Sequence, residues 1–584
     1  MWFGIGTSSL RLLLGNFQEC CGERVNRLYF GDNLEVLGEH VENESVDLVY
    51  LDPPFNSNRN YSVIFGRNRA EDESAAQIQA FEDTWKWTHT TEVLIGDLSN
   101  TAPTRVADAL SAYYTLLGES EALAYLVNMT PRLLQLYRVL KPTGSLYLHC
   151  DPTMSHYLKV LLDAVFDVRY FRNEVVWKRT NSHNSAKRWG PQHDTLLFYT
   201  KSDAYTWNRT FQEYDRSYIQ EKFVWDDPRG KYQDVALTGP GIRAGDSGKP
   251  WRGIDPTNSG RHWQPPSLMY DYYEELTGES LAGLPVQERL DRADDLGLIH
   301  WPKKRGGQPR FKQFVHISPG APVQDMIVDI DPINSQAAER LGYPTQKPIT
   351  LMERIITASS NPGDVVLDPF CGCGTTVDAA QRLSRNWIGI DITYLAVDVI
   401  AKRLRHTFGD AVFDTIKVDG IPKDLGGARA LFDRSPLEFE TWAVTMVNAE
   451  PNRRQVGDKG VDGIARFPLG GRGQIGKLVV SVKGGKTINP AMVRELSGAM
   501  DARKAQMGVL ITMASATRGV TDAINHGGVF THPANGQKYP RLQHITVADL
   551  LKKKRPQVPP TFLPYIAAQQ QPVTLEQTTL FDTA

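Results

Sequence analysis

Two short segments of the chain carry residues that could do chemistry, and each follows an apolar run typical of a buried strand. Residues 52–55 (Asp-Pro-Pro-Phe) come directly after residues 46–51, and residues 368–376 (Asp-Pro-Phe-Cys-Gly-Cys-Gly-Thr-Thr) come directly after residues 365–367. In an open α/β sheet, ligands bind in the crevice outside the carboxyl ends of the strands. The two segments can therefore meet in space, one as a substrate loop and the other as a cofactor loop.

These two motifs, in this order, resemble the amino-methyltransferases of DNA, in the permuted subclass where the Asp-Pro-Pro-aromatic loop precedes the cofactor loop. The resemblance covers about residues 27 to 408. It implies a Rossmann-like α/β sheet, S-adenosylmethionine as the cofactor and double-stranded DNA as the partner. Because such enzymes work on a single base, it also implies that the target base leaves the duplex.

The substrate loop suits an exocyclic amino group, which is a poor nucleophile because its lone pair is delocalised into the base. The Asp52 carboxylate and the Pro53 carbonyl could accept hydrogen bonds from both amino hydrogens and draw the nitrogen toward tetrahedral geometry. Pro53 and Pro54 lack backbone donors and stiffen the turn. Phe55 could stack on the flipped base. The predicted catalytic residues are Asp52, Pro53, Pro54 and Phe55.

In the family, Asp at the first position of this loop indicates adenine N6 methylation, whereas enzymes acting on cytosine N4 more often carry Ser. Cytosine N4 methylation, RNA methylation and a non-catalytic DNA-binding protein that senses the cofactor remain alternatives. Methylation of protein glutamine is disfavoured, because those enzymes usually carry Asn where this chain has Asp52.

The cofactor loop combines flexibility with charge. Gly372 and Gly374 allow a sharp turn at the strand end, and the following helix start favours the carboxylate of a methionine. Asp368 could meet a cationic group, and Asp391 ends the next strand, where an acid accepts hydrogen bonds from ribose. The predicted cofactor-binding residues are Asp32, Lys347, Asp368, Phe370, Gly372, Gly374, Thr375 and Asp391. Asp32 also reads as a helix N-cap, and Lys347 as the start of a helix.

Between about residues 205 and 340 the periodicity weakens, which indicates an inserted recognition region. Within it, residues 301–312 hold five basic residues and no acid, flanked by aromatic side chains. This composition is typical of a surface that binds the DNA backbone. The predicted DNA-binding residues are Lys303, Lys304, Arg305, Arg310 and Lys312.

Residues 435 to 550 resemble the Mrr-type restriction endonuclease domain. Such nucleases hold magnesium with carboxylates and place a lysine at the scissile phosphate. The candidate residues are Glu438, Asp462, Ser481 and Lys483, with Asp462 as the metal ligand. Ser481 departs from the superfamily, which has Glu, Asp or Gln two residues before the lysine. The sequence therefore leaves open whether this domain cuts DNA with Mg²⁺ or is a degenerate DNA-binding scaffold.

The alternation of strands and helices predicts an α/β fold. We expect strands at 28–30, 46–51, 145–149 and 194–200 in a continuing parallel order. The predicted domains are an N-terminal extension (1–26), a methyltransferase catalytic part (27–204), a target-recognition insert (205–340), a cofactor-binding part (341–408), a linker (409–434), a C-terminal α/β nuclease-like domain (435–565) and a flexible tail (566–584).

Composition limits the partners and the cellular compartment that the chain can have. The formal net charge is -2, so any contact with DNA must come from local basic patches. The five cysteines lack paired ligand spacing, which argues against a disulfide framework or structural zinc site and favours a reducing cytoplasm. No apolar stretch approaches the roughly 20 residues of a membrane span. The oligomeric state stays open, a homodimer included.

Overall fold

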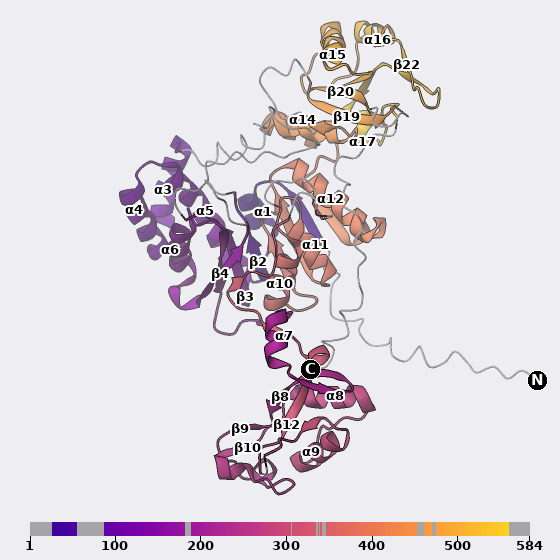
Figure 1. Ribbon diagram of the computed structural model, residues 1–584. Helices are drawn as coiled ribbons and strands as arrows, with labels where there is room; N and C mark the ends of the chain where they lie inside the picture. Colours follow the sequence, from indigo (N-terminus) through magenta and orange to yellow (C-terminus); the bar gives the residue numbers. More distant parts are fainter. Residues whose placement is uncertain are drawn as a thin grey trace, which may run out of the picture. The chain divides into compact units, whose positions relative to one another are not determined.

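The computed structural model describes residues 26–54, 87–180, 189–304, 306–333, 337, 339–340, 346–451, 461–469 and 475–559. These residues form two compact units, one made of residues 209–324 and the other of the rest of the described chain (Figure 1). Phe55 and Arg305, which were predicted as site residues, lie outside the described ranges, as do nearly all of the predicted N-terminal extension and the whole predicted tail.

The larger unit is built on a nine-stranded sheet with the order β14-β4-β5-β3-β2-β15-β16-β1-β17. Its strands are β1 (Asn26–Phe30), β2 (Val46–Leu51), β3 (Leu140–Cys150), β4 (Phe171–Lys178), β5 (His193–Thr200), β14 (Met326–Ile327), β15 (Val365–Asp368), β16 (Asn386–Asp391) and β17 (Ile416–Asp419). The pairs from β3 to β17 are parallel, but β5 is antiparallel to both β3 and β4. The predicted strand at 194–200 is present, and its predicted parallel order is wrong. Because β4 and β5 are consecutive and antiparallel, the chain can join them without a crossover helix.

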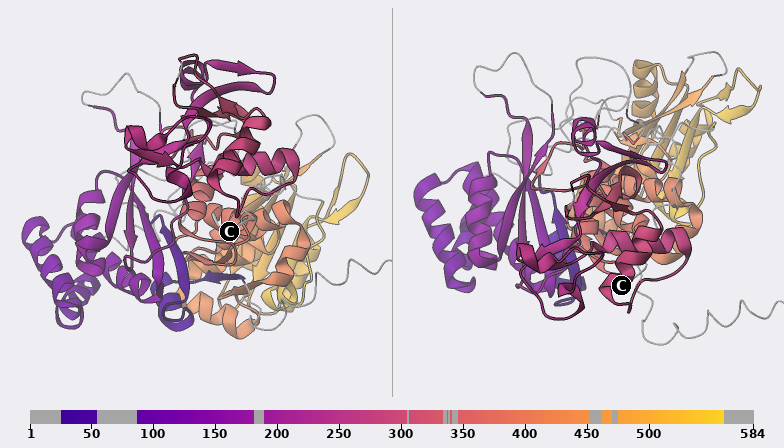
Figure 2. Two further views of the ribbon diagram at one scale, coloured as in Figure 1. Left: turned by 90° about the horizontal axis from the view of Figure 1, so that it is seen from below. Right: turned by 60° about the horizontal axis from the view of Figure 1, so that its bottom comes forward.

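Helices cover both faces of this sheet, and strand side chains alternate between two cores. On β2, Leu48 and Tyr50 point into one core, and Val49 and Leu51 point into the other. The first core includes residues of α10 (Ile349–Ser359), α11 (Thr375–Arg382) and α12 (Tyr394–Phe408). The second includes residues of α1 (Asn33–His40), α3 (His89–Thr101), α4 (Thr104–Leu117), α5 (Glu121–Val139) and α6 (Ser155–Phe166), on the opposite side of the sheet (Figure 2).

Residues 409–434, predicted as a linker, are part of the fold. They contain β17, which pairs in parallel with β1 and extends the sheet, and α13 (Leu425–Arg434). The sequence suggested a linker because Gly426 and Gly427 usually interrupt helices. Both lie in the first turn of α13, where the Asp424 side chain accepts a hydrogen bond from the Gly427 amide at 2.8 Å and caps the helix.

The smaller unit, residues 209–324, falls inside the predicted insert at 205–340. A four-stranded antiparallel sheet, β11-β12-β8-β7, packs against helices over an aromatic core that includes Trp251, Trp263 and Phe314. Its elements are β6 (Phe211–Gln212), α7 (Arg216–Lys222), β7 (Trp225–Asp227), β8 (Gly230–Ala236), β9 (Thr238–Pro240), β10 (Arg261–Trp263), α8 (Ser267–Thr277), α9 (Val286–Asp295), β11 (Ile299–His300), β12 (Arg310–Phe314) and β13 (Ala321–Pro322).

The C-terminal part of the larger unit has its own five-stranded sheet with the order β18-β19-β20-β21-β24, antiparallel up to β20 and parallel beyond it. Its elements are α14 (Pro436–Thr445), β18 (Glu450–Pro451), β19 (Gly463–Pro468), β20 (Ile475–Lys483), α15 (Pro490–Arg503), β21 (Met507–Thr512), α16 (Arg518–Asn525), β22 (Val529–Thr531), β23 (Lys538–Pro540), β24 (Leu542–Thr546) and α17 (Val547–Leu551). Among the described helices of the whole chain, none is long and apolar enough to cross a membrane.

Candidate active site

The predicted catalytic loop begins at the carboxyl edge of the large sheet, directly after β2. The Asp52 carboxylate forms an ion pair through Oδ2 with the Lys347 ammonium, and the two side chains are 16% and 10% exposed. Oδ1 of Asp52 makes no hydrogen bond within the described residues. The pair therefore balances the charge of Asp52 and fixes its direction, while one oxygen stays available. Lys347, which was predicted beside the cofactor, thus contacts the catalytic loop.

The predicted cofactor loop begins next to it, because β15 and β2 are neighbours in the sheet, with Leu367 opposite Val49. Asp368 at the end of β15 is 4% exposed and accepts a hydrogen bond from the Phe370 amide at 3.0 Å. Burial raises its pKa to about 7, and the charges of Asp52 and Asp391 add to the rise, although a hydrogen bond from the Thr376 hydroxyl opposes it.

Asp368 has no cationic partner among the described residues. A buried carboxylate of this kind becomes ionised at little cost when a positive group binds beside it. The donor set therefore fits S-adenosylmethionine, which carries an ammonium and a sulfonium group.

The turn of the cofactor loop requires glycine. Gly372 and Gly374 have φ angles of +48° and +75°, in the left-handed region. A Cβ atom on Gly374 would lie 2.7 Å from Cγ1 of Ile400 on α12. A side chain at position 374 would therefore require the loop or the Ile400 side chain to shift.

Asp391, at the end of β16, holds the other side of this turn. Its Oδ2 accepts a hydrogen bond from the Gly372 amide at 2.9 Å, and its Oδ1 accepts from the amide and hydroxyl of Thr393 at 2.9 and 2.8 Å. Burial raises its pKa to about 6 against the effect of these hydrogen bonds. Asp391 thus orders the loop, and its remaining lone pairs could accept a ribose hydroxyl.

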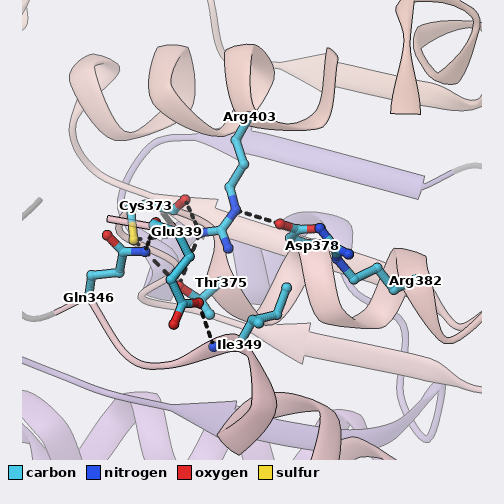
Figure 3. Close-up of polar contacts among 8 residues, drawn as sticks. All are labelled: Glu339, Gln346, Ile349, Cys373, Thr375, Asp378, Arg382 and Arg403. Atoms are coloured by element: carbon cyan, nitrogen blue, oxygen red, sulfur yellow. Dashed lines mark hydrogen bonds and ion pairs between the residues drawn. The ribbon is translucent and has the colours of Figure 1, made fainter. Parts of the chain in front are cut away.

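Two buried arginines that the sequence reasoning missed brace these loops. Arg403 of α12 donates to the Cys373 carbonyl at 3.3 Å and the Thr375 hydroxyl at 3.2 Å, and pairs with Asp378 at 2.6 Å (Figure 3). The close-up shows the guanidinium between the loop residues Cys373 and Thr375 on one side and Asp378 of α11 on the other. Because each partner is buried, the loop is fixed before any ligand binds.

The second arginine, Arg132 of α5, braces the loop after β1. It pairs with Asp32 at 2.8 Å and donates to the Asn33 side chain at 2.6 Å, while Asn33 donates to the Pro369 carbonyl at 2.8 Å. Asp32 also caps α1, as predicted from the sequence alone, by accepting from the Leu34 amide at 2.7 Å. An arginine among the apolar residues that α5 buries was the signal that could have revealed this role.

A buried polar chain, also missed, lies beside the catalytic loop across β2, β3 and β5. The Tyr50 hydroxyl is 2.8 Å from Nδ1 of His149, whose Nε2 is 3.2 Å from Oδ2 of Asp194, and Arg179 pairs with Asp194 at 2.9 Å. Burial lowers the pKa of His149, with Lys347 adding to the effect, so the imidazole is neutral. The chain ties the strand that ends at Asp52 to its neighbours.

Comparison with known proteins assigns the chain that forms this site to a family. Residues 46–402 match the family described as DNA methylase, with N6 and N4 specificities, which is more than half of the chain. The chain belongs to the N6/N4 DNA methylase family. Residues 438–552 match a second family, described as NACHT-associated inactive restriction endonuclease 1.

Two curated relatives of this methylase chain are a type II methyltransferase and a subunit of a type III restriction-modification enzyme. It is 34% identical over 305 residues to the type II methyltransferase M.EcaI of Enterobacter cloacae, a match that covers 52% of this chain and 62% of that protein. It is 25% identical over 376 residues to the StyLTI Mod subunit, a type III restriction-modification enzyme of Salmonella typhimurium, covering 62% and 50%. The chain thus spans less than two thirds of each of these relatives.

Among solved structures, a DNA modification methylase of Thermus thermophilus matches 68% of this chain and 99% of its own with 15% identity and a TM-score of 0.31. The PvuII DNA methyltransferase, described as cytosine-N4-specific, matches 68% of this chain and 94% of its own with 16% identity and a TM-score of 0.28.

The predicted DNA-binding residues of the methylase divide into two groups in the smaller unit. Lys303 and Lys304 are exposed and form no ion pair within the described ranges. Lys312 pairs with Asp227 at 2.8 Å, and Arg310 with Asp234 at 3.4 Å. Burial opposes ionisation of Asp227, but the hydrogen bonds from Lys312 and Arg229 together outweigh it and the pKa falls to about 2. Lys312 therefore stabilises this unit internally, and the free cations among these described residues are Lys303 and Lys304.

Of the predicted nuclease residues, Asp462 and Ser481 contact each other, whereas Glu438 contacts the methylase part. Asp462 accepts hydrogen bonds through Oδ2 from the Val482 amide at 2.6 Å and from the Ser481 hydroxyl at 3.2 Å. Lys483 forms no ion pair within the described residues. Glu438 accepts instead from the amide of Tyr394 in the methylase part, at 3.1 Å. In the described ranges, which omit residues 452–460, no three His, Cys, Asp or Glu side chains are grouped to hold a metal ion.

The pKa of Asp368 predicts how cofactor affinity depends on pH. A cationic ligand binds the ionised form, so affinity falls as the pH drops below about 7. Between pH 8 and pH 6 we expect the ratio of the S-adenosylmethionine Kd of Asp368→Asn to that of the native chain to fall about tenfold. Titration calorimetry of both proteins measures this ratio, in which the titration of the ligand itself cancels. A ratio that does not change with pH contradicts the assignment of Asp368.

The contact at Gly374 predicts a difference between two glycines. Gly374 and Gly363 both have positive φ, so alanine at either costs roughly 1–2 kcal/mol of backbone strain. A Cβ at Gly363 meets nothing within 4 Å, whereas one at Gly374 meets Ile400. We expect Gly374→Ala to weaken S-adenosylmethionine binding at least several-fold and Gly363→Ala to leave it unchanged, measured by calorimetry after equilibrium unfolding confirms that both variants fold. Equal affinities would show that the loop tolerates the displacement.

Proposed function

We propose that this chain is a site-specific DNA methyltransferase that transfers the methyl group of S-adenosylmethionine to the exocyclic amino group of a flipped base, with adenine N6 as its target. The observation that carries the proposal is the placement of Asp52, held by Lys347, beside the loop that starts at Asp368. Family membership supports the reaction class, and the similarity to the StyLTI Mod subunit, a restriction-modification enzyme, supports the biological setting.

In this mechanism the chain binds, orients and deprotonates the amino group. Oδ1 of Asp52 and the Pro53 carbonyl accept its two hydrogens, which turns the nitrogen lone pair toward the cofactor loop. S-adenosylmethionine, when bound, supplies an electrophilic methyl group. Asp52 is also the base placed to receive the proton that the nitrogen loses, and Lys347 keeps its other oxygen in position.

The residues of the cofactor loop and of the end of β16 bind the cofactor. Asp368 faces the cationic groups, the amino end of α11 at Thr375 favours the carboxylate, and Asp391 accepts from the ribose. We assign DNA backbone contacts to Lys303 and Lys304, which are exposed and free of ion pairs among the described residues. The identity of the base rests on Asp52, since the family includes both N6 and N4 specificities.

The test is to incubate the purified chain with S-adenosylmethionine and unmethylated genomic DNA and to map modified bases by long-read sequencing. We expect N6-methyladenine at one recurring sequence. Asp52→Ala should lower the rate by about 10²–10³-fold, as when a preorganised transition-state contact is removed, yet still bind S-adenosylhomocysteine. N4-methylcytosine at one sequence would show that the target base is cytosine and not adenine. No methylation on any DNA would overturn the proposal in favour of a cofactor sensor.

For the C-terminal part we propose a non-cutting nuclease fold. The Asp462 carboxylate is engaged by Ser481 and the Val482 amide, and Glu438 by the methylase part. We expect no strand breaks in plasmid DNA with MgCl₂ at about 10 mM, which is ample for carboxylate-bound Mg²⁺, with or without S-adenosylmethionine, and the same result for Lys483→Ala. Breaks that depend on magnesium and disappear in Lys483→Ala would establish a working nuclease despite Ser481.

A further inference from the structure

The C-terminal nuclease-like part and the methylase part share one hydrophobic core. Phe30 of β1 and Ile400 of α12 belong to the same cluster of buried side chains as Phe439 and Trp442 of α14. Helix α14 contacts α12 directly, and both parts belong to the same compact unit. Burial of large aromatic side chains from both sides is typical of a permanent interface rather than a transient one.

A single carboxylate joins this interface to the start of α12. Oε2 of Glu438 accepts a hydrogen bond from the amide of Tyr394, the first residue of α12, at 3.1 Å. The amides of a helix's first turn have no partner within the helix, so an acceptor from another element stabilises them. Thr393 caps the same turn from within, by accepting from the Ala396 amide at 3.3 Å.

Neighbouring side chains hold Tyr394 in the position where Glu438 contacts it. The Tyr394 ring packs edge-on against Phe30, with centroids 5.9 Å apart, and its hydroxyl bonds with Thr445 of α14. The Arg434 guanidinium lies 5.9 Å from the Phe30 ring centre. Contacts from β1, α13 and α14 therefore surround the amino end of α12.

This helix end is continuous with the cofactor loop. Asp391 binds the Gly372 amide with one oxygen and Thr393 with the other. Tyr394 follows Thr393, so the chain of hydrogen bonds runs from the glycine turn through Asp391 and Thr393 to the residue that Glu438 holds. A shift of α14 would move the turn at residues 391–394, where the ribose is expected to bind.

We propose that Glu438 is a positioning residue of the cofactor site, through which the nuclease-like part of the chain and cofactor binding are coupled. The identity of the cofactor rests on the proposed function, but the coupling itself does not require methyl transfer. Because coupling between two sites is reciprocal, the cofactor must order α14 to the same extent that α14 favours the cofactor. The degenerate nuclease fold thus serves the methylase as a built-in support of its cofactor pocket.

The first test measures the Kd of S-adenosylhomocysteine by calorimetry on the full-length chain. Glu438→Ala should weaken binding about fivefold, the order expected from the loss of one helix-capping hydrogen bond. Glu438→Gln keeps an acceptor oxygen and should restore most of the affinity. Asp433→Ala, an exposed acid on the neighbouring α13 with no partner in the described residues, is the matched control and should bind like the native chain. Native affinity in Glu438→Ala would overturn the proposal.

The second test uses hydrogen exchange on the native chain, so it does not depend on how a variant folds. S-adenosylhomocysteine should slow amide exchange in α14 as well as in residues 391–396. Protection confined to the methylase loops, with α14 unchanged, would overturn the coupling. If α14 is protected and no DNA becomes methylated, the proposed reaction fails while the coupling stands. If DNA is methylated and amide exchange in α14 does not change, the coupling fails while the proposed reaction stands.

Discussion

The other features of this structure follow from the repulsion between three carboxylates at the carboxyl edge of one sheet. Asp52, Asp368 and Asp391 follow or end strands of the same sheet, and like charges in a buried place disfavour one another. Lys347 balances Asp52, and amide and hydroxyl donors stabilise Asp391. Asp368 has no cation beside it in the described residues, and its pKa rises to about 7. The site is thereby built to gain from a bound positive charge.

Holding these groups apart requires rigid loops, which explains the two buried arginines. Arg403 pins the cofactor loop to α11, and Arg132 pins the loop after β1 to the Pro369 region. Removing one partner of such a buried pair leaves an uncompensated charge, so these contacts are strongly maintained once formed. The cost of ordering the loops is met during folding, which leaves more of the ligand's binding energy for affinity.

In the C-terminal part, the partners of the polar side chains differ from those that a metal-dependent nuclease needs. Asp462 precedes β19, which pairs with β20, and the Ser481 hydroxyl of β20 donates to the Asp462 carboxylate at a position where a second carboxylate would help to bind a metal ion. Glu438, which the sequence suggested as a nuclease carboxylate, faces the methylase part instead. A local motif specifies residue types, but the partner each side chain finds depends on which domains pack together.

The sequence by itself determined the α/β class, the strand-loop order of residues 46–54 and 365–376, and the glycine turn. These features depend on periodicity and on backbone conformations that few residue types allow. Only the tertiary structure decided that β5 runs antiparallel, that residues 409–434 complete the sheet, and that Lys347 meets Asp52. Strand direction, edge pairing and buried ion pairs join residues far apart in the chain, and no local pattern records which partner each will meet.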